Sequence, residues 1–191
     1  MKKRFPFVTL SVTLAALVVY AVPGLSAWLV YNRTEILRGE WWRLFTAPLV
    51  HFSSSHLFWD ALVFAGAGTA VEWLGYRRFW LACTVAAFLP GLYYLAFKPH
   101  LLVYGGLSGL STGAVVYLAL HRAKRGGWES AAWTAVLVLV AAKIAVEAGL
   151  HHAIFARAGA QPFPVLPSAH IAGCLGACAA FIVDLLKKSP A

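Results

Sequence analysis

The chain has 191 residues, of which 61% are hydrophobic and only 12% are charged. Soluble domains carry about 25% charged and roughly 45–50% apolar residues, so this composition excludes a disordered chain, a collagen-like repeat and an ordinary soluble domain. It predicts an integral membrane protein. The formal net charge of +9 does not indicate nucleic acid binding, because basic residues in membrane proteins gather beside the spans, and we expect no nucleic acid partner.

Six stretches are long and apolar enough to cross a bilayer, which takes about 20 residues of helix. They are Phe7–Val30, His56–Leu74, Phe79–Phe97, Val103–Leu120, Ala131–Leu150 and Val165–Leu186. The first follows a basic triplet, but it is too long for the apolar part of a signal peptide, and we interpret it as a retained span. The predicted fold class is an all-α integral membrane protein, a six-helix bundle forming one domain over residues 1–191.

Basic residues in the short loops predict the orientation of these spans, because Lys and Arg favour the cytoplasmic side. One side carries ten of the 16, namely Lys2, Lys3, Arg4, Arg77, Arg78, Arg122, Lys124, Arg125, Lys187 and Lys188. The other carries five, namely Arg33, Arg38, Arg43, Lys98 and Arg157. Both termini are therefore expected in the cytoplasm.

Ionisable residues interrupt the apolar pattern at related depths. Inside the spans lie Asp60, Lys143, Glu147 and His170, and at the mouth of the second span lie His51 and His56. Such residues usually face a bundle interior or a watery cavity. At 1.5 Å per residue, Asp60, Glu147 and His170 lie about 5–8 Å from the outer ends of their spans. The sequence predicts one polar layer near the non-cytoplasmic side.

The fourth span opens with several glycines, at positions 105, 106, 109 and 113. One interpretation is close helix packing, because Gly109 and Gly113 form a small-xxx-small pair and Ala169 and Gly173 form another on the sixth span. The other interpretation is catalytic. Ser108 would lie in the first turn of a helix, beside free backbone N–H groups that can bind an oxyanion. His170, at a matching depth, would supply the base for a serine nucleophile.

Four motifs in order resemble the rhomboid family of intramembrane serine proteases. They are Trp42-Arg43-x-x-Thr46, His51-x-x-x-x-His56-x-x-x-Asp60, Gly106-x-Ser108-Gly109 and Ala169-His170-x-x-Gly173. The resemblance implies that Ser108 attacks a peptide carbonyl and that His170 transfers its proton to the leaving amine. It implies a dyad without a third carboxylate. It also implies an oxyanion site formed by the Ser108 N–H, His56 and residue 60, supported by Gly106 and His51.

Trp42 and Arg43 would belong to a half-buried loop between the first two spans. An interfacial role suits an amphipathic Trp and a snorkelling Arg even without catalysis.

Two positions depart from the family pattern. Residue 60 is Asp where the family has Asn, and Thr112 replaces an aromatic residue that stacks on the catalytic histidine. An ionised carboxylate cannot donate to an oxyanion. Either Asp60 is protonated and donates, or it is ionised and pairs with His51, His56 or Lys143, leaving the oxyanion to His56 and the backbone.

A narrower resemblance is to the rhombosortases, compact six-span members of the family. Lys143 and Glu147, four residues apart, and Phe163-Pro164-Val165 carry this likeness. The pair is also explained as an i,i+4 ion pair that neutralises two charges within the bilayer. The subgroup is associated with substrates that carry a C-terminal Gly-Gly signal before an apolar helix.

The resemblance implies a multi-pass protein of the bacterial inner membrane that cleaves membrane-anchored protein substrates and needs no cofactor or metal. The main alternative is an inactive relative that binds transmembrane clients. A transporter using Asp60, Lys143 and Glu147 is a further alternative, although no inverted repeat supports it. A zinc site from His51, His56, Asp60 and His170 is also conceivable, but these residues lack the spacing of a structural site.

Overall fold

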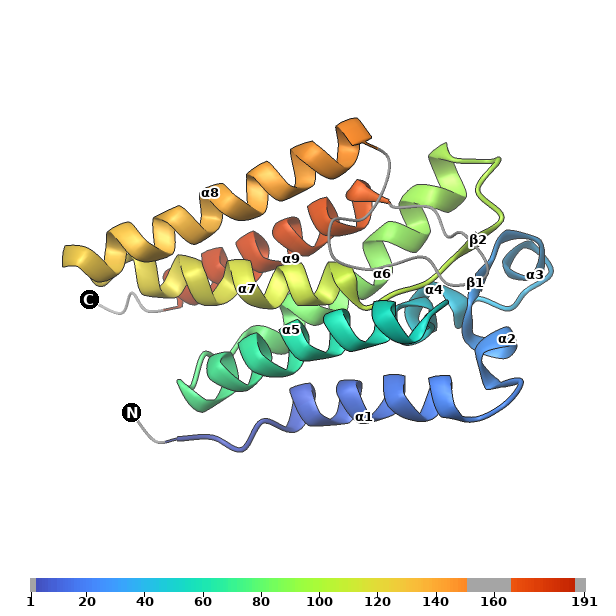
Figure 1. Ribbon diagram of the computed structural model, residues 1–191, viewed down its shortest axis with the longest axis horizontal. Coiled ribbons are helices and arrows are strands. Elements are labelled where there is room, and N and C mark those ends of the chain that lie inside the picture. The colour runs from blue at the N-terminus through green and yellow to red at the C-terminus, as the bar shows by residue number, and fades with distance from the viewer. Residues whose placement is uncertain (1–2, 151–165, 188–191) are drawn as a thin grey trace.

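The computed structural model describes residues 3–150 and 166–187, and its long helices lie side by side along one axis (Figure 1). They are α1 (Phe7–Ala21), α5 (Ser54–Trp73), α6 (Phe79–Phe97), α7 (Ser108–Ala123), α8 (Gly127–Leu150) and α9 (Pro167–Leu186). Successive long helices run in opposite directions, so α1 begins and α9 ends at the same end of the bundle (Figure 1).

Short elements close the opposite end of the bundle, where α5, α7 and α9 begin (Figure 1). They are α2 (Leu25–Leu29), β1 (Tyr31–Asn32), α3 (Arg33–Leu37), α4 (Arg43–Thr46), η1 (Ala47–Leu49) and β2 (Val103–Tyr104). The two strands pair antiparallel, with Tyr31 opposite Tyr104. This pairing fixes the segment that leads into α7.

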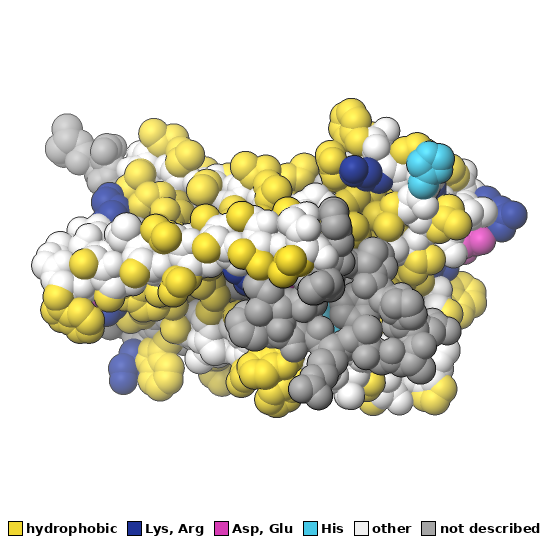
Figure 2. Space-filling view, turned by 45° about the horizontal axis from the view of Figure 1, so that its top comes forward, with side chains coloured by type: hydrophobic (Ala, Val, Ile, Leu, Met, Phe, Trp, Pro, Cys, Tyr) yellow, Lys and Arg dark blue, Asp and Glu magenta, His cyan; other side chains and the backbone are white. Residues whose placement is uncertain are grey.

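The outer surface of the long helices is apolar, as expected for contact with lipid. Figure 2 shows hydrophobic side chains covering one face, with most Lys and Arg toward the ends of the long axis. Among the described residues, α6, α8 and α9 are long and apolar enough to cross a membrane by length and composition. The helical architecture is thereby confirmed, and crossing by the other three long helices stays a prediction.

The largest differences between the predicted spans and the observed helices lie at the end of the first and the start of the fourth. The first was expected to continue to Val30, but α1 ends at Ala21 because Val22 is extended before Pro23 and the residue before a proline disfavours helix. The fourth was expected from Val103, which instead pairs with β1, so α7 begins at Ser108. The sixth helix begins at Pro167; Val165, its predicted start, lies outside the described residues.

Helices α7 and α9 approach each other through their small residues. A Cβ added to Gly109 would lie 2.8 Å from the carbonyl oxygen of Ala169, and one added to Gly113 would lie 3.1 Å from that of Gly173. Small residues allow backbones to pack closely and gain dispersion contacts in lipid. The close-packing interpretation of both small-residue pairs is therefore confirmed.

Side-chain carboxylates fix the helices at the end of the bundle that lies away from the short elements. Asp184 of α9 accepts a hydrogen bond from the Tyr117 hydroxyl of α7, and its carboxylate lies 3.2 Å from His121 Nε2. Glu72 of α5 accepts from the backbone N–H groups of Val8 and Thr9 at 3.1 and 2.8 Å. These N–H groups at the start of α1 have no partner within their helix. Both carboxylates thus satisfy polar groups that lipid could not.

We predict that Gly173→Ala destabilises the bundle by about 1–3 kcal/mol, the usual cost of overpacking, because the new methyl group would overlap the carbonyl oxygen of Gly109. Thermal unfolding in detergent would measure the loss. Gly66→Ala on α5 is the matched control: a Cβ there meets nothing within 4 Å, so this change should be neutral or stabilise by up to about 1 kcal/mol. Equal stability of the two variants would contradict the close α7–α9 contact.

Candidate active site

Ser108 is the first residue of α7 and is half-buried, at the end of the glycine-rich turn. Gly106, two residues earlier, has a backbone φ of 129°. A Cβ at Gly106 would lie 2.8 Å from His56 Nε2, so both the conformation and the contact require glycine. The turn therefore brings the N-terminus of α7 against α5.

His170 lies in the first turn of α9, three residues after Pro167, and is 5% exposed. Its neighbour Ala169 makes the close backbone contact with Gly109. Ser108 and His170 are therefore each the immediate neighbour of a residue in a close backbone contact between α7 and α9.

His51, His56 and Asp60 form one buried cluster. Ser53 caps the N-terminus of α5 by accepting a hydrogen bond from the His56 backbone N–H at 3.1 Å. Helical spacing then places His56 and Asp60 on one face, with Asp60 Oδ2 3.2 Å from His56 Nε2 and 3.3 Å from His51 Nε2. The cluster brings together three of the predicted support residues.

The cluster has the residue types of a metal site, and its ligand atoms lie within 4.8 Å of one another. However, His51 Nε2 also accepts a hydrogen bond from the Leu107 backbone N–H at 3.3 Å, while His51 Nδ1 lies 3.3 Å from the Leu49 carbonyl oxygen. A nitrogen lone pair engaged by an N–H group cannot also bind a metal. His170, the fourth member of the conceivable zinc set, faces Glu147 instead.

Lys143 and Glu147 of α8 form the expected i,i+4 ion pair, with Lys143 Nζ 2.6 Å from Glu147 Oε2. The same carboxylate oxygen lies 3.2 Å from His170 Nδ1. The resemblance to the rhomboid family implied a dyad without a third carboxylate, and this contact differs from that expectation. The only sequence signal for it was the matching depth of Glu147 and His170.

Thr112 lies one turn after Ser108 on α7 and is half-buried. Among the described residues, no aromatic ring stacks on His170. The carboxylate of Glu147 is the polar group at its ring. The place that an aromatic side chain takes in the family pattern is thus not filled from α7.

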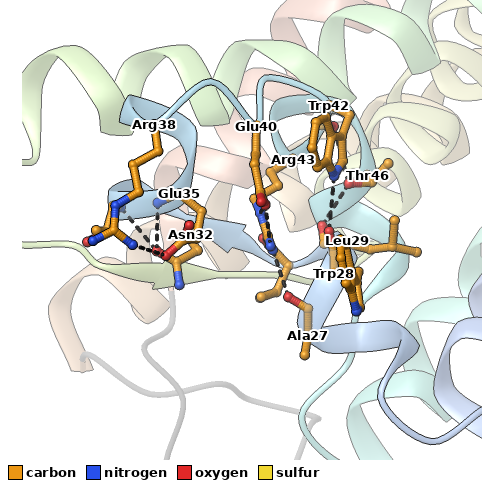
Figure 3. Close-up of polar contacts among 12 residues, drawn as sticks. Ala27, Trp28, Leu29, Asn32, Glu35, Arg38, Glu40, Trp42, Arg43 and Thr46 are labelled. Carbon is orange, nitrogen blue, oxygen red and sulfur yellow. Dashed lines mark hydrogen bonds and ion pairs between the residues drawn. The ribbon is translucent and has the colours of Figure 1, made fainter.

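Arg43 is buried and fastens the loop that precedes α5 (Figure 3). Its guanidinium donates to the backbone carbonyls of Ala27 and Val30 at 2.7 and 2.9 Å and to Glu40 at 2.6 Å. Trp42, by contrast, is exposed and donates its indole N–H to the Trp28 carbonyl. Trp42 thus has the exposure expected of an interfacial residue, whereas Arg43 is a buried structural residue rather than a snorkelling one.

Lys143 and Glu147, which carry part of the resemblance to the rhombosortases, are thus in contact. The other part, Phe163-Pro164-Val165, lies outside the described residues.

Comparisons with known proteins identify the family of this chain. A family model described as Rhomboid domain matches residues 38–186, and the chain belongs to the rhomboid family. The rhomboid protease GlpG of Salmonella paratyphi A is 32% identical over 136 residues, which cover 62% of this chain and 49% of that protein. The rhomboid protease GluP of Bacillus subtilis is 36% identical over 93 residues, 47% of this chain and 18% of that protein. The chain thus spans about half or less of the length of these relatives.

Proposed function

We propose that the chain is an intramembrane serine endopeptidase in which Ser108 is the nucleophile and His170 the general base. The observation that supports the proposal is the close contact between Gly109 and Ala169, the residues next to Ser108 and His170 at the starts of α7 and α9. Membership of the rhomboid family and the two named proteases among its relatives support the same activity.

The reaction would proceed by acyl transfer. His170 takes the proton from the Ser108 hydroxyl as its oxygen attacks the substrate carbonyl, and the resulting oxyanion is held by N–H groups in the first turn of α7, which have no helical partner. His170 then protonates the leaving amine. Water hydrolyses the acyl-enzyme with His170 again as the base.

Asp60 would support this oxyanion site indirectly, through the histidine ring that it orients. Its Oδ2 atom lies 3.2 Å from His56 Nε2, the position of an acceptor that orients the His56 ring rather than of a donor to the substrate. His51 Nε2, 3.3 Å from the same oxygen, accepts from the Leu107 N–H instead. The distances favour the ionised arrangement, in which Asp60 fixes the orientation of His56. Lys143 is not part of it, because this residue pairs with Glu147.

The proposed setting is a bacterial inner membrane, crossed by all six long helices with both termini in the cytoplasm. The alternating directions of the helices in Figure 1 agree with the division of basic residues between the two sides. The reaction site would then face the non-cytoplasmic side, where water can enter.

The proposed substrates are membrane-anchored proteins, and the finer proposal is a rhombosortase-like preference for a Gly-Gly segment before a C-terminal helix. It is supported by the Lys143–Glu147 pair.

We predict that Ser108→Ala and His170→Ala each lower cleavage by roughly 10⁴–10⁶-fold, and that the double variant loses little more, because nucleophile and base act as a unit. A fluorophosphonate should label wild type at Ser108 and label His170→Ala slowly. Ser111→Ala is the control. Its hydroxyl donates to the Asp60 carbonyl oxygen at 2.9 Å, so this variant should lose some stability but keep labelling.

Cleavage by Ser108→Ala at the wild-type rate would contradict the proposed protease activity. Binding of transmembrane helices without any labelling of wild type would support the inactive relative instead.

We predict that Asp60→Asn lowers the cleavage rate roughly 10- to 100-fold, less than the about 10²–10³-fold lost with a direct oxyanion donor. The reason is that the His56 ring loses its charged acceptor. Rates of wild type and variant would be compared from pH 5 to 9. A variant that keeps full activity and extends it to higher pH would favour a protonated, donating Asp60.

We predict that reporters fused after residue 187 and within the Arg122–Arg125 loop both read cytoplasmic, because basic residues are retained on that side. A reporter in the loop after Lys98 should read periplasmic and serves as the opposite control. A periplasmic C-terminus would overturn the proposed orientation.

We predict that a membrane-anchored substrate with Gly-Gly before its C-terminal helix is cleaved at least about tenfold faster than one with Leu-Leu there, because bulky residues hinder approach of the scissile bond to a half-buried serine. Quantitative blotting after co-expression would give the ratio. Equal cleavage of both substrates would leave a protease without the Gly-Gly preference.

A further inference from the structure

Helix α8 places one side chain in the interior of the protein, and that side chain is charged. All residues of α8 are described, and among them Glu147 is the one that is buried, with 2% exposure. The remainder of this helix faces outward or is half-buried. Placing a carboxylate inside an apolar bundle is costly unless it is paired, so the position of Glu147 calls for an explanation beyond packing.

Lys143 alone does not provide that explanation. Its side chain is 29% exposed, and an ion pair formed on the outer face of α8 would neutralise both charges without burying either fully. Glu147 is instead directed inward, where its Oε2 atom lies 3.2 Å from Nδ1 of the buried His170. The carboxylate therefore bridges a half-exposed lysine and a buried histidine.

We propose that Glu147 is a positioning residue for His170 and completes a Ser108–His170–Glu147 triad. This inference rests on the proposed protease function. A carboxylate at Nδ1 holds the proton on that nitrogen, so the lone pair of Nε2 is the one that accepts the serine proton. It also stabilises the imidazolium that forms when the proton arrives. Glu147 neither touches substrate nor becomes protonated, because the proton moves between Ser108, Nε2 and the leaving amine.

Lys143 has a definite part in this arrangement. Its ammonium group shares the Glu147 oxygen that faces His170, so it withdraws negative charge from the imidazolium. The charged and titratable groups near His170 are Glu147 of α8, Lys143 on the same carboxylate oxygen, and Tyr94 of α6, whose hydroxyl lies 2.9 Å from Oγ of Ser168, two residues before His170. Replacing the two members of the ion pair should therefore have opposite effects on the histidine.

The experiment compares Glu147→Gln, Glu147→Asp, Lys143→Gln and the double Gln variant in detergent, using kcat, KM, the pH–rate profile and thermal stability. Glu147→Gln should lower kcat by roughly 10²–10⁴-fold with KM nearly unchanged, and move the acidic limb of the profile to lower pH. Lys143→Gln should keep kcat within about tenfold of wild type, and move that limb to higher pH. Glu147→Asp should recover part of the kcat lost in Glu147→Gln.

A purely structural ion pair predicts a different pattern. Either single substitution would then strand its partner, so both would lower stability and activity alike, and the neutral double variant would recover both. That pattern, or a Glu147→Gln enzyme with wild-type kcat and pH profile, would overturn the triad.

The double variant also covers the case in which Glu147→Gln fails to fold, because it leaves no unpaired charge. It should fold and remain slow if Glu147 positions His170, and recover wild-type kcat if the pair is structural. Failure of the protease proposal itself is recognised separately, by Ser108→Ala cleaving as fast as wild type. In the triad, Ser108→Ala is inactive and the Glu147 variants fall between it and wild type.

Discussion

The close approach of α7 and α9 is the constraint on which the rest of the site depends. No hydrophobic driving force holds two helices together in lipid, because lipid is as apolar as their side chains. Dispersion contacts between closely packed small residues hold them together instead. Here Gly109 and Gly173 let the backbones meet at the ends where Ser108 and His170 lie. A larger side chain at either glycine would move Ser108 away from His170.

Two carboxylates are buried near this contact, and each lies beside two basic residues. Asp60 lies between His51 and His56, and Glu147 lies between Lys143 and His170. A carboxylate held between two basic groups is offset on both sides, which makes its burial in an apolar bundle tolerable. The arrangement also orients the His56 and His170 rings, because each presents one nitrogen to its carboxylate, Nε2 in His56 and Nδ1 in His170.

Local patterns in the sequence predicted much of this structure, and tertiary contacts account for what was missed. Small-residue spacing predicted the α7–α9 contact, and i,i+4 spacing predicted the Lys143–Glu147 pair, because each depends on a single helix face. Length and hydropathy extended the first span past Pro23 and the fourth back to Val103, where β1 provides a strand partner. The Glu147–His170 contact depends on how α8 is rotated about its axis relative to α9. The sequence of neither helix alone determines that rotation.

The two carboxylates differ in how firmly the fold holds them, and this difference bears on catalysis. Asp60 belongs to α5, which packs along α7 with Phe64 and Val71 fully buried in the shared core. Glu147 is the one fully buried residue of α8, whose Trp133, Leu137 and Val140 are only partly buried against the core. An outward shift of α8 would therefore separate the carboxylate from His170 while the α7–α9 contact stayed intact. The fold thus sets Ser108 and His170 on closely packed helices and Glu147 on the less buried α8, so in the proposed triad the strength of the base depends on where α8 lies.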